Sequence, residues 1–377
     1  MSLFLFIYVL IYGAMNAYVL LRARWAFDLS AKGTLWIAGI CAFMVAAPVL
    51  VRVFESRGLE SIARPLAYLA FSWFGLVFLF LSLGMALEIY RLAALALGKG
   101  TAWRFYPGTA AMFWVPMVLS IALFVYGYSE AAKVRVERVG MSSAKMNPMR
   151  RKVRIAQVSD IHLGLMTGEK RIRRIVDILK AENPDIIVST GDLVDGVTFD
   201  SDSLSAIFAT LSPRYGMFAV LGNHEYYAGL DKAIAFTEKS GFRLLRGEAL
   251  EINTLPLSIA GADFVSRMTT GEDPQVTESA LFDGLPEDNF NLLLKHVPYV
   301  DSSGLQDLQL SGHTHKGQIF PFSLVVRMFY PRIAGLYYMD GGSWLYVSRG
   351  TGVWGPPIRV LSPPEVTIIE ISPDIRD

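Results

Sequence analysis

The stretch "VRIAQVSDIH", residues 153–162, joins a short, mostly apolar segment to the polar pair Asp160 and His162. The apolar segment is typical of a buried strand, and the polar pair comes at the point where that strand ends. Ligands of open α/β sheets bind beyond the carboxyl ends of the strands. An Asp-x-His pair alone is a weak signal, because most such pairs are surface residues, so its meaning depends on the rest of the chain.

The same arrangement recurs after four further predicted strands. The polar residues that follow them are Asp192 and Asp195 after "DIIVST", Asn223, His224 and Glu225 after "GMFAVL", His296 after "NFNLLLK", and His313 and His315 after "DLQL". All five histidines of the chain lie at these strand ends. Carboxylate, imidazole and carboxamide groups thus gather at one edge, which predicts a metal site.

The segments between these strands alternate with them. Residues 169–182, "EKRIRRIVDILKAE", carry their apolar side chains at helical spacing. Strand and helix alternate three times as far as Gly241, and the chain is strand-rich after Phe242. This order indicates an α/β fold whose sheet has parallel strands and covering helices.

The number of candidate ligands bears on the number of ions. Two Asp, one Asn and four His exceed the four ligands that one zinc ion usually takes. They suit two ions that share a carboxylate, an arrangement that clamps both oxygens of a displacement at phosphorus. Mixed oxygen and imidazole ligands favour Mn, Fe or Zn over Ca.

These motifs together resemble a known family. The series Asp160-x-His162, Gly191-Asp192-x-x-Asp195, Gly222-Asn223-His224-Glu225, His296 and Gly312-His313-x-His315 resembles the calcineurin-like metallophosphoesterases over residues 152–372. The tail "YVSRGTGVWGPPIRVLSPPEVTIIEI" resembles the bacterial membrane-associated or exported branch of that family. The resemblance implies a four-layer α/β/β/α sandwich.

The resemblance also implies roles for single residues. One divalent ion would be held by Asp160, His162, Asp192 and His315, and the other by Asp192, Asn223, His296 and His313, with Asp192 bridging. His224 and Asn223 would then act on the phosphate, and the attacking group would be a metal-bound hydroxide. Asp195 and Glu225 are expected either to orient ligands or to lie in solvated turns. Lys316, Arg349 and Arg359 are expected to bind substrate, with surface ion pairs as the alternative for the two arginines.

These residues predict a hydrolase that cleaves a phosphodiester or a pyrophosphate, with a lipid-linked substrate as one option. A phosphomonoesterase is the first alternative. A catalytically inactive metal-binding scaffold for protein contacts is the second. The net charge of +1 gives no indication of a nucleic-acid partner.

The first part of the chain is a different kind of polypeptide. Residues 1–130 hold 14 of the 69 charged residues, and four runs in it have none: 3–21, 34–51, 65–87 and 108–128. Each run approaches the roughly 20 apolar residues that span a bilayer. We therefore expect a four-span transmembrane domain at 1–130, a linker at 131–151 and a metallophosphoesterase domain at 152–377. Four buried helices of a soluble core are the alternative.

The charges around the first run bear on orientation. No Lys or Arg precedes it, so we expect a retained helix rather than a cleaved signal peptide. Arg22, Arg24 and Lys32 after it favour the extracytoplasmic side for the hydrolase domain of a multi-pass inner-membrane protein, whereas the arginines of residues 52–64 oppose this. The single cysteine, Cys41, excludes an intramolecular disulfide.

The segment 319–339 follows the last histidine pair. It holds two arginines, no acidic residue and many large apolar side chains. One interpretation is ordinary core, broken into short pieces by Pro321 and Pro331. The other is an apolar lip that borders the active site and dips toward the bilayer.

Overall fold

The structure is a computed structural model that describes residues 3–96, 107–149, 151–196, 201–262, 264, 278–300 and 305–374. Its residues form two compact units. One comprises Met1–Glu130 with Gly355–Ile358, and the other comprises Ala131–Trp354 with Arg359–Asp377. We call them the helical unit and, after its expected activity, the hydrolase unit.

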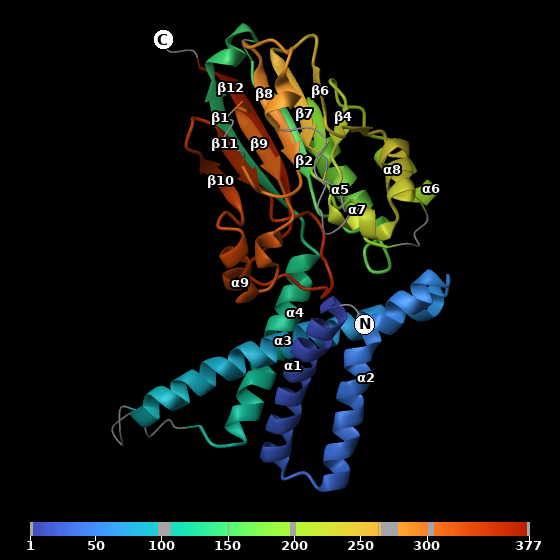
Figure 1. The fold of residues 1–377 in the computed structure, drawn as a ribbon, viewed down its shortest axis with the longest axis vertical. Coiled ribbons are helices and arrows are strands. Elements are labelled where there is room, and N and C mark those ends of the chain that lie inside the picture. Colours follow the sequence, from blue (N-terminus) through green and yellow to red (C-terminus); the bar gives the residue numbers. More distant parts are fainter. Residues whose placement is uncertain are drawn as a thin grey trace. The chain divides into compact units, whose positions relative to one another are not determined.

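The helical unit contains four long helices (Figure 1). They are α1 Leu3–Phe27, α2 Ala31–Ser56, α3 Glu60–Ala96 and α4 Ala111–Ala131. All four are long and apolar enough to cross a membrane, with mean hydropathies of 1.6 to 2.2. The prediction of four N-terminal helices that could span a membrane is therefore confirmed.

Polar contacts join α1 and α3 inside this unit. Trp73 donates its indole N–H to Asn16 Oδ1 at 2.9 Å, and Arg22 forms a salt bridge with Glu88. A charged or amide side chain in an apolar helix is costly unless it has a partner in a neighbouring helix. These two pairs therefore fix which faces of α1 and α3 meet.

The first sheet of the hydrolase unit has six strands in the order β1-β12-β2-β3-β4-β5. Their bounds are β1 Arg135–Ser143, β2 Val153–Val158, β3 Ile186–Ser189, β4 Met217–Ala219, β5 Arg243–Leu244 and β12 Glu365–Pro373. Strands β2 to β5 are parallel, and β12 runs antiparallel to β2. The carboxyl ends of β2, β3 and β4 therefore meet at one edge.

Strand β1 lies within residues 131–151, which we expected to form a linker. It pairs in parallel with β12 along its whole length. Its apolar residues alternate between the two faces: Val136 packs toward the covering helices, and Val139 and Met141 pack toward the second sheet. This short run of alternating apolar residues forms a strand because β12 supplies the backbone groups that it pairs with. The helix η2, Ala144–Met149, follows it.

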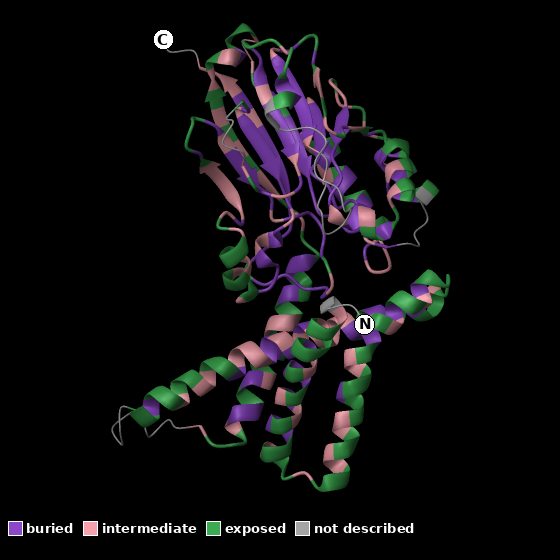
Figure 2. Cartoon of the chain, in the orientation of Figure 1, coloured by how far each residue is buried: buried purple, intermediate pink, exposed green. Residues whose placement is uncertain are grey.

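The second sheet also has six strands, in the order β10-β11-β9-β8-β7-β6. Their bounds are β6 Glu248–Glu251, β7 Leu257–Ala262, β8 Phe290–Lys295, β9 Leu308–Ser311, β10 Gly335–Tyr338 and β11 Trp344–Val347. Strands β7, β8, β9 and β11 are parallel. Apolar residues of both sheets fill the space between them, and Figure 2 shows these strands as buried.

Helices cover the outer faces of the two sheets. Three of them pack on the first sheet: α5 Glu169–Glu182, α6 Ser201–Phe208 and α8 Leu230–Lys239. On the second sheet, the covering helix within the described residues is η3, Glu278–Phe282, which packs on β7 and β8. The predicted four-layer α/β/β/α class is confirmed, with the outermost layer reduced to η3 in this part of the chain. The short helices α7 Asn223–Ala228, η4 His315–Gly317 and α9 Phe322–Phe329 lie beyond strand ends.

Candidate metal centre

Five strand ends, three from the first sheet and two from the second, deliver polar side chains to one place. Asp160 follows β2, Asp192 follows β3 and Asn223 follows β4. From the second sheet, His296 follows β8 and His313 follows β9. The residues converge because parallel strands of each sheet end on the same side, and the two sheets are stacked.

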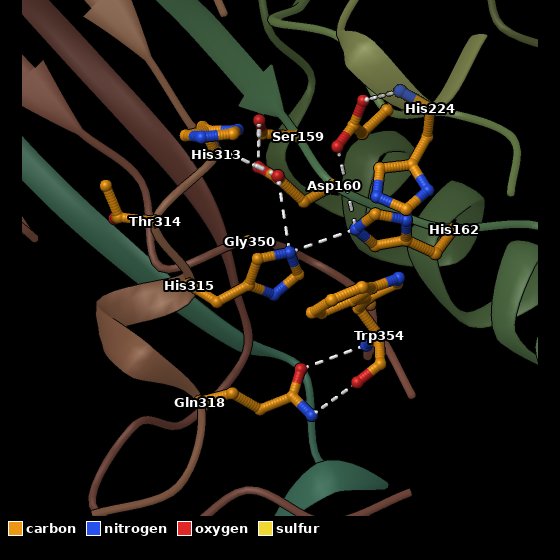
Figure 3. A network of polar contacts seen from close by, with 12 residues as sticks. Ser159, Asp160, His162, His224, His313, Thr314, His315, Gln318, Gly350 and Trp354 are labelled. Atoms are coloured by element: carbon orange, nitrogen blue, oxygen red, sulfur yellow. Dashed lines mark hydrogen bonds and ion pairs between the residues drawn. The ribbon is translucent and has the colours of Figure 1, made fainter. Parts of the chain in front are cut away.

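The first group of side chains consists of Asp160, His162 and His315 (Figure 3). The Nε2 atoms of His162 and His315 are 2.9 Å apart, and His315 Nε2 lies 3.3 Å from Asp160 Oδ1. All three residues are buried. The ligand atoms of these three residues all lie within 4.8 Å of one another, close enough to hold one metal ion together.

The second group consists of Asp192, His296 and His313, with Asn223 beside it. His296 Nε2 lies 3.2 Å from Asp192 Oδ2, 3.2 Å from Asn223 Oδ1 and 3.1 Å from His313 Nδ1. One nitrogen thus meets three polar atoms, more than a single proton on it can satisfy. The ligand atoms of Asp192, His296 and His313 are also close enough to hold one metal ion together.

Asp192 lies between the two groups. Its Oδ2 atom is 3.2 Å from His296 Nε2 and 3.9 Å from His162 Nε2. The seven residues expected to hold metal are therefore brought together, with the expected bridging carboxylate in the middle. Their oxygen and imidazole atoms fit Mn, Fe or Zn. The binding of two ions by these residues stays a prediction.

Burial and the carboxylate of Asp192 shift the pKa values of the histidines in these groups. Burial, then the charge of His224, lowers the pKa of His162 to about 3. Burial, then the charge of His296, lowers the pKa of His313 to about 4. Both imidazoles are therefore neutral at neutral pH, the form that binds a metal ion. Burial opposes protonation of His296 as well, but Asp192 overcomes it and raises the pKa of His296 to about 10.

The backbone at the strand ends is strained. Five of the seven residues have left-handed backbone conformations, with φ between 48° and 70°: Asp160, His162, Asp192, His313 and His315. Such conformations are uncommon for residues other than glycine and cost about 1–3 kcal/mol each. Hydrogen bonds hold them, such as the one from the His162 N–H to the Asp192 carbonyl at 3.0 Å. The turns aim the side chains over the sheet edge.

Two glycines make room for the carboxylates. A Cβ atom at Gly222 would collide with Asp192 Oδ1 and would lie 2.8 Å from His296 Cε1. A Cβ atom at Gly312 would collide with Asp160 Oδ2. Both positions therefore require glycine because of close approach, so the glycines beside the histidine motifs have a structural reason.

Glu225 organises the loop that carries Asp192. Its buried carboxylate accepts hydrogen bonds from the backbone N–H groups of Gly222 at 2.7 Å, Asp192 at 2.9 Å and Leu193 at 2.6 Å. Burial, then the charge of Asp192, raises the pKa of Glu225 to about 7, and these N–H groups act against that rise. Of the two roles expected for Glu225, the structure therefore gives it the orienting one.

His224 differs from the other four histidines. Its Nδ1 lies 2.5 Å from Asp195 Oδ1, and its backbone N–H donates to Asp192 Oδ1 at 2.9 Å. Its ring meets His162 edge to face at 4.6 Å and Trp354 at 5.6 Å between centroids. Burial lowers the pKa of His224, but Asp192 and then Asp195 raise it to about 9. His224, Asp192 and His162 are also close enough to share an ion, so geometry alone leaves both roles open.

The three residues expected to bind substrate have different surroundings. Arg349 pairs with Glu137 at 2.7 Å and with Glu365, and Arg359 is fully buried. Both guanidinium groups therefore serve the fold, in contrast to the expected phosphate contacts. Lys316 is half-buried beside His315, and its ammonium group has no ion pair within the described residues. For Lys316, substrate binding stays a prediction.

Arg359 instead lies against His315. Its guanidinium donates to the Arg349 carbonyl at 2.7 Å and to the Gly352 carbonyl at 2.6 Å, and lies 3.0 Å from His315 Nδ1. Burial lowers the pKa of Arg359 to about 9. A buried cation among carbonyl groups holds the C-terminal tail around the histidine, a role that the sequence pattern did not indicate.

Two further residues of the site were not predicted. Tyr330 places its hydroxyl 3.0 Å from His313 Nε2, and Ser159 donates its hydroxyl to Asp160 Oδ2 at 2.5 Å. Such outer contacts fix the orientation of a metal-binding side chain. Ser159 could have been found from the sequence, because it directly precedes Asp160. Tyr330 lies beyond a helix, and no sequence motif indicates it.

Comparisons with known proteins agree on one family. The sequence model described as calcineurin-like phosphoesterase matches residues 153–317. An uncharacterized metallophosphoesterase of Aquifex aeolicus is 38% identical over 258 residues, which cover 68% of this chain and 98% of that protein. An uncharacterized metallophosphoesterase of Campylobacter jejuni is 26% identical over 382 residues, which cover 98% of each protein. A Danio rerio transmembrane protein with metallophosphoesterase domain is 30% identical over 266 residues, covering 67% of this chain and 61% of that protein.

The contact at Gly222 yields a prediction. Gly222→Ala should weaken Mn²⁺ binding by about 10- to 100-fold, the usual effect of disturbing groups that orient a metal ligand, because the new methyl group displaces Asp192. The affinity is measured by isothermal titration calorimetry, with Gly140→Ala as the control, since a Cβ atom there meets nothing within 4 Å. Wild-type affinity in Gly222→Ala would contradict the proposed placement of Asp192.

Proposed function

Because the chain belongs to the calcineurin-like metallophosphoesterase family, we propose that it is a membrane-anchored hydrolase of phosphodiesters or pyrophosphates that uses two divalent metal ions. The observation that carries this proposal is the pair of ligand groups with Asp192 between them. A single group would suit one ion. Two groups around one carboxylate suit two.

The ligands divide between the ions as follows. Asp160, His162, Asp192 and His315 would hold one, and Asp192, Asn223, His296 and His313 would hold the other. Bound divalent metal ions lower the pKa of a coordinated water and neutralise charge that develops on phosphoryl oxygens. Mn, Fe and Zn all suit this donor set.

The remaining chemistry falls to residues of the chain. His224 holds one ring nitrogen, Nδ1, against Asp195, which leaves Nε2 to meet the substrate. A histidine oriented in this way can donate a proton to a leaving oxygen. Asn223 begins α7 next to His296, so its amide group can contact both a metal ion and a phosphate. Trp354 meets the His224 ring edge to face, with the ring centroids 5.6 Å apart.

The membrane anchor rests on the helical unit. Four helices that could cross a membrane, together with a relative named as a transmembrane protein, support a membrane protein. An anchored hydrolase meets membrane-borne substrates at a high effective concentration, which favours a lipid-linked phosphodiester or pyrophosphate. The side of the membrane stays a prediction, and Arg24 and Lys32 after the first span favour the extracytoplasmic side.

Two assays test this function against its alternatives. The purified chain with Mn²⁺ should hydrolyse bis(4-nitrophenyl) phosphate faster than 4-nitrophenyl phosphate, and EDTA should abolish both reactions. Faster cleavage of the monoester would instead indicate a phosphomonoesterase. Bound metal without turnover of either compound would indicate an inactive scaffold.

The bridging role of Asp192 predicts an asymmetry between two variants. His315→Ala should lose chiefly one of the two ions, whereas Asp192→Asn should impair both, because only Asp192 faces both groups. Elemental analysis gives the metal content per chain. An unchanged metal content in Asp192→Asn, together with full activity, would rule out the bridging assignment.

His224 is assigned to chemistry rather than to metal binding. His224→Ala should lower turnover of the diester by about 10²- to 10⁴-fold, the range for loss of an acid–base group, while metal content stays near that of the wild type. The control is Lys232→Ala, an exposed position on α8. If His224→Ala loses metal together with activity, His224 is a ligand and the roles must be reassigned.

A further inference from the structure

Helix α9 exposes an apolar surface beside the metal centre. None of its eight residues is buried, and Met328, Phe329 and Leu324 expose 80%, 67% and 58% of their surface. Figure 2 shows the helix as mostly exposed. Large apolar side chains gathered in this way usually mark an interaction surface.

Residues 319–339 divide into buried and exposed parts. Ile319, Ile333 and Met339 are buried, with 6%, 2% and 8% exposure, as expected of core. Helix α9 lies between them and is exposed. The exposed part is therefore a defined eight-residue helix, flanked on both sides by residues that pack into the hydrolase unit.

Contacts at both ends hold α9 in its exposed position. Before it, the Phe320 N–H donates to the Val360 carbonyl at 3.1 Å. After it, Thr314 donates its hydroxyl to the Ile333 carbonyl at 2.7 Å, and the Tyr330 hydroxyl lies 3.0 Å from His313 Nε2. One end of α9 is thus attached to the C-terminal tail at Val360 and the other to the loop that carries His313, and the apolar side chains of the helix stay outside the core of the hydrolase unit.

The charge of this region points to the chemistry of the partner. Arg327 lies on the helix and Arg332 follows it, and no acidic residue occurs between Asp307 and Asp340. A surface that combines Phe, Leu and Met side chains with arginines fits the lipid–water interface, where the apolar groups enter the acyl region and the arginines meet anionic headgroups.

We propose that α9 is an interfacial helix that inserts its apolar side chains into a lipid bilayer containing anionic lipids. The four candidate membrane spans of the same chain keep the hydrolase unit at a bilayer, so the helix finds this partner at a high effective concentration. The contact would carry the histidine loop to the membrane surface. For a lipid-linked substrate, a consequence that rests on the proposed function, the phosphate would then meet the metal centre without leaving the membrane.

The test uses the full chain in liposomes and does not depend on activity. In a Cys41→Ser background, which has no other cysteine, a fluorophore is attached at Met328→Cys or, as the control, at Lys232→Cys on α8. Lipids with brominated acyl chains should quench the label at position 328 at least about threefold more strongly than the label at position 232, because only the former enters the acyl region. Aqueous iodide should show the reverse preference.

Other quenching results would contradict the proposal. Quenching of the label at position 328 by iodide rather than by brominated lipid would place α9 in water and overturn the proposal. A label that neither reagent quenches would show α9 covered by protein, either the helical unit or a second copy, and would also overturn it. In liposomes without anionic lipid, lipid quenching at position 328 should fall at least about twofold, and Arg327→Gln with Arg332→Gln should cause the same loss. Unchanged quenching in both would contradict the role of the arginines.

Discussion

The buried carboxylate of Asp192 is the charge around which the two groups of histidines are arranged. Burying a carboxylate is costly unless it is paired and hydrogen-bonded. Asp192 meets this condition with His296 at 3.2 Å from the second sheet and with the backbone N–H of His224 at 2.9 Å from the first. Its surroundings therefore require that strand ends of both sheets lie at the same edge, and the stacking of the sheets becomes a condition of the site.

The same constraint explains the unusual backbone around the site. Side chains that must point past the end of a strand need a sharp change of direction, and five of the expected ligands have left-handed conformations. Close approach at Gly222 and Gly312 excludes any side chain there. The conformational free energy stored in these turns is opposed by the hydrogen bonds of Glu225 and by the packed sheets behind them. Strain of this kind persists only where the surrounding fold determines the conformation.

The C-terminal tail also contributes to the surroundings of the site. Arg359 donates to the carbonyls of Arg349 and Gly352 and contacts His315 Nδ1, so that tail residues lie around a histidine from another part of the chain. On the other side, Tyr330 connects His313 with the end of α9. The loop that carries His313 and His315 thus contacts both the buried Arg359 and the end of the exposed helix α9. A surface that binds α9 is therefore connected to the candidate metal centre.

Much of this could be predicted from the sequence, because its signals are local. Apolar runs such as 65–87 predict membrane helices by length alone, and Asp160, His162 and the later histidines follow recognisable strands in an order typical of one family. Period and position along the chain suffice for such inferences. The bridging role of Asp192 is implied by the family resemblance alone and stays a prediction.

Other features were decided only by tertiary structure. Alternating apolar residues at 134–139 already indicate a short strand within the expected linker 131–151, but its place at the sheet edge depends on β12, more than 200 residues away. Arg349 and Arg359 look like phosphate-binding residues in sequence, yet Glu137 and Glu365 neutralise one, and a set of carbonyls surrounds the other. Within residues 319–339, Ile319, Ile333 and Met339 are buried whereas helix α9 is exposed, although large apolar side chains occur in both parts. The physical reason is that hydrophobic periodicity is a property of neighbouring residues, whereas the partner of a buried charge, or the cover of an apolar helix, depends on which distant segments the fold brings together.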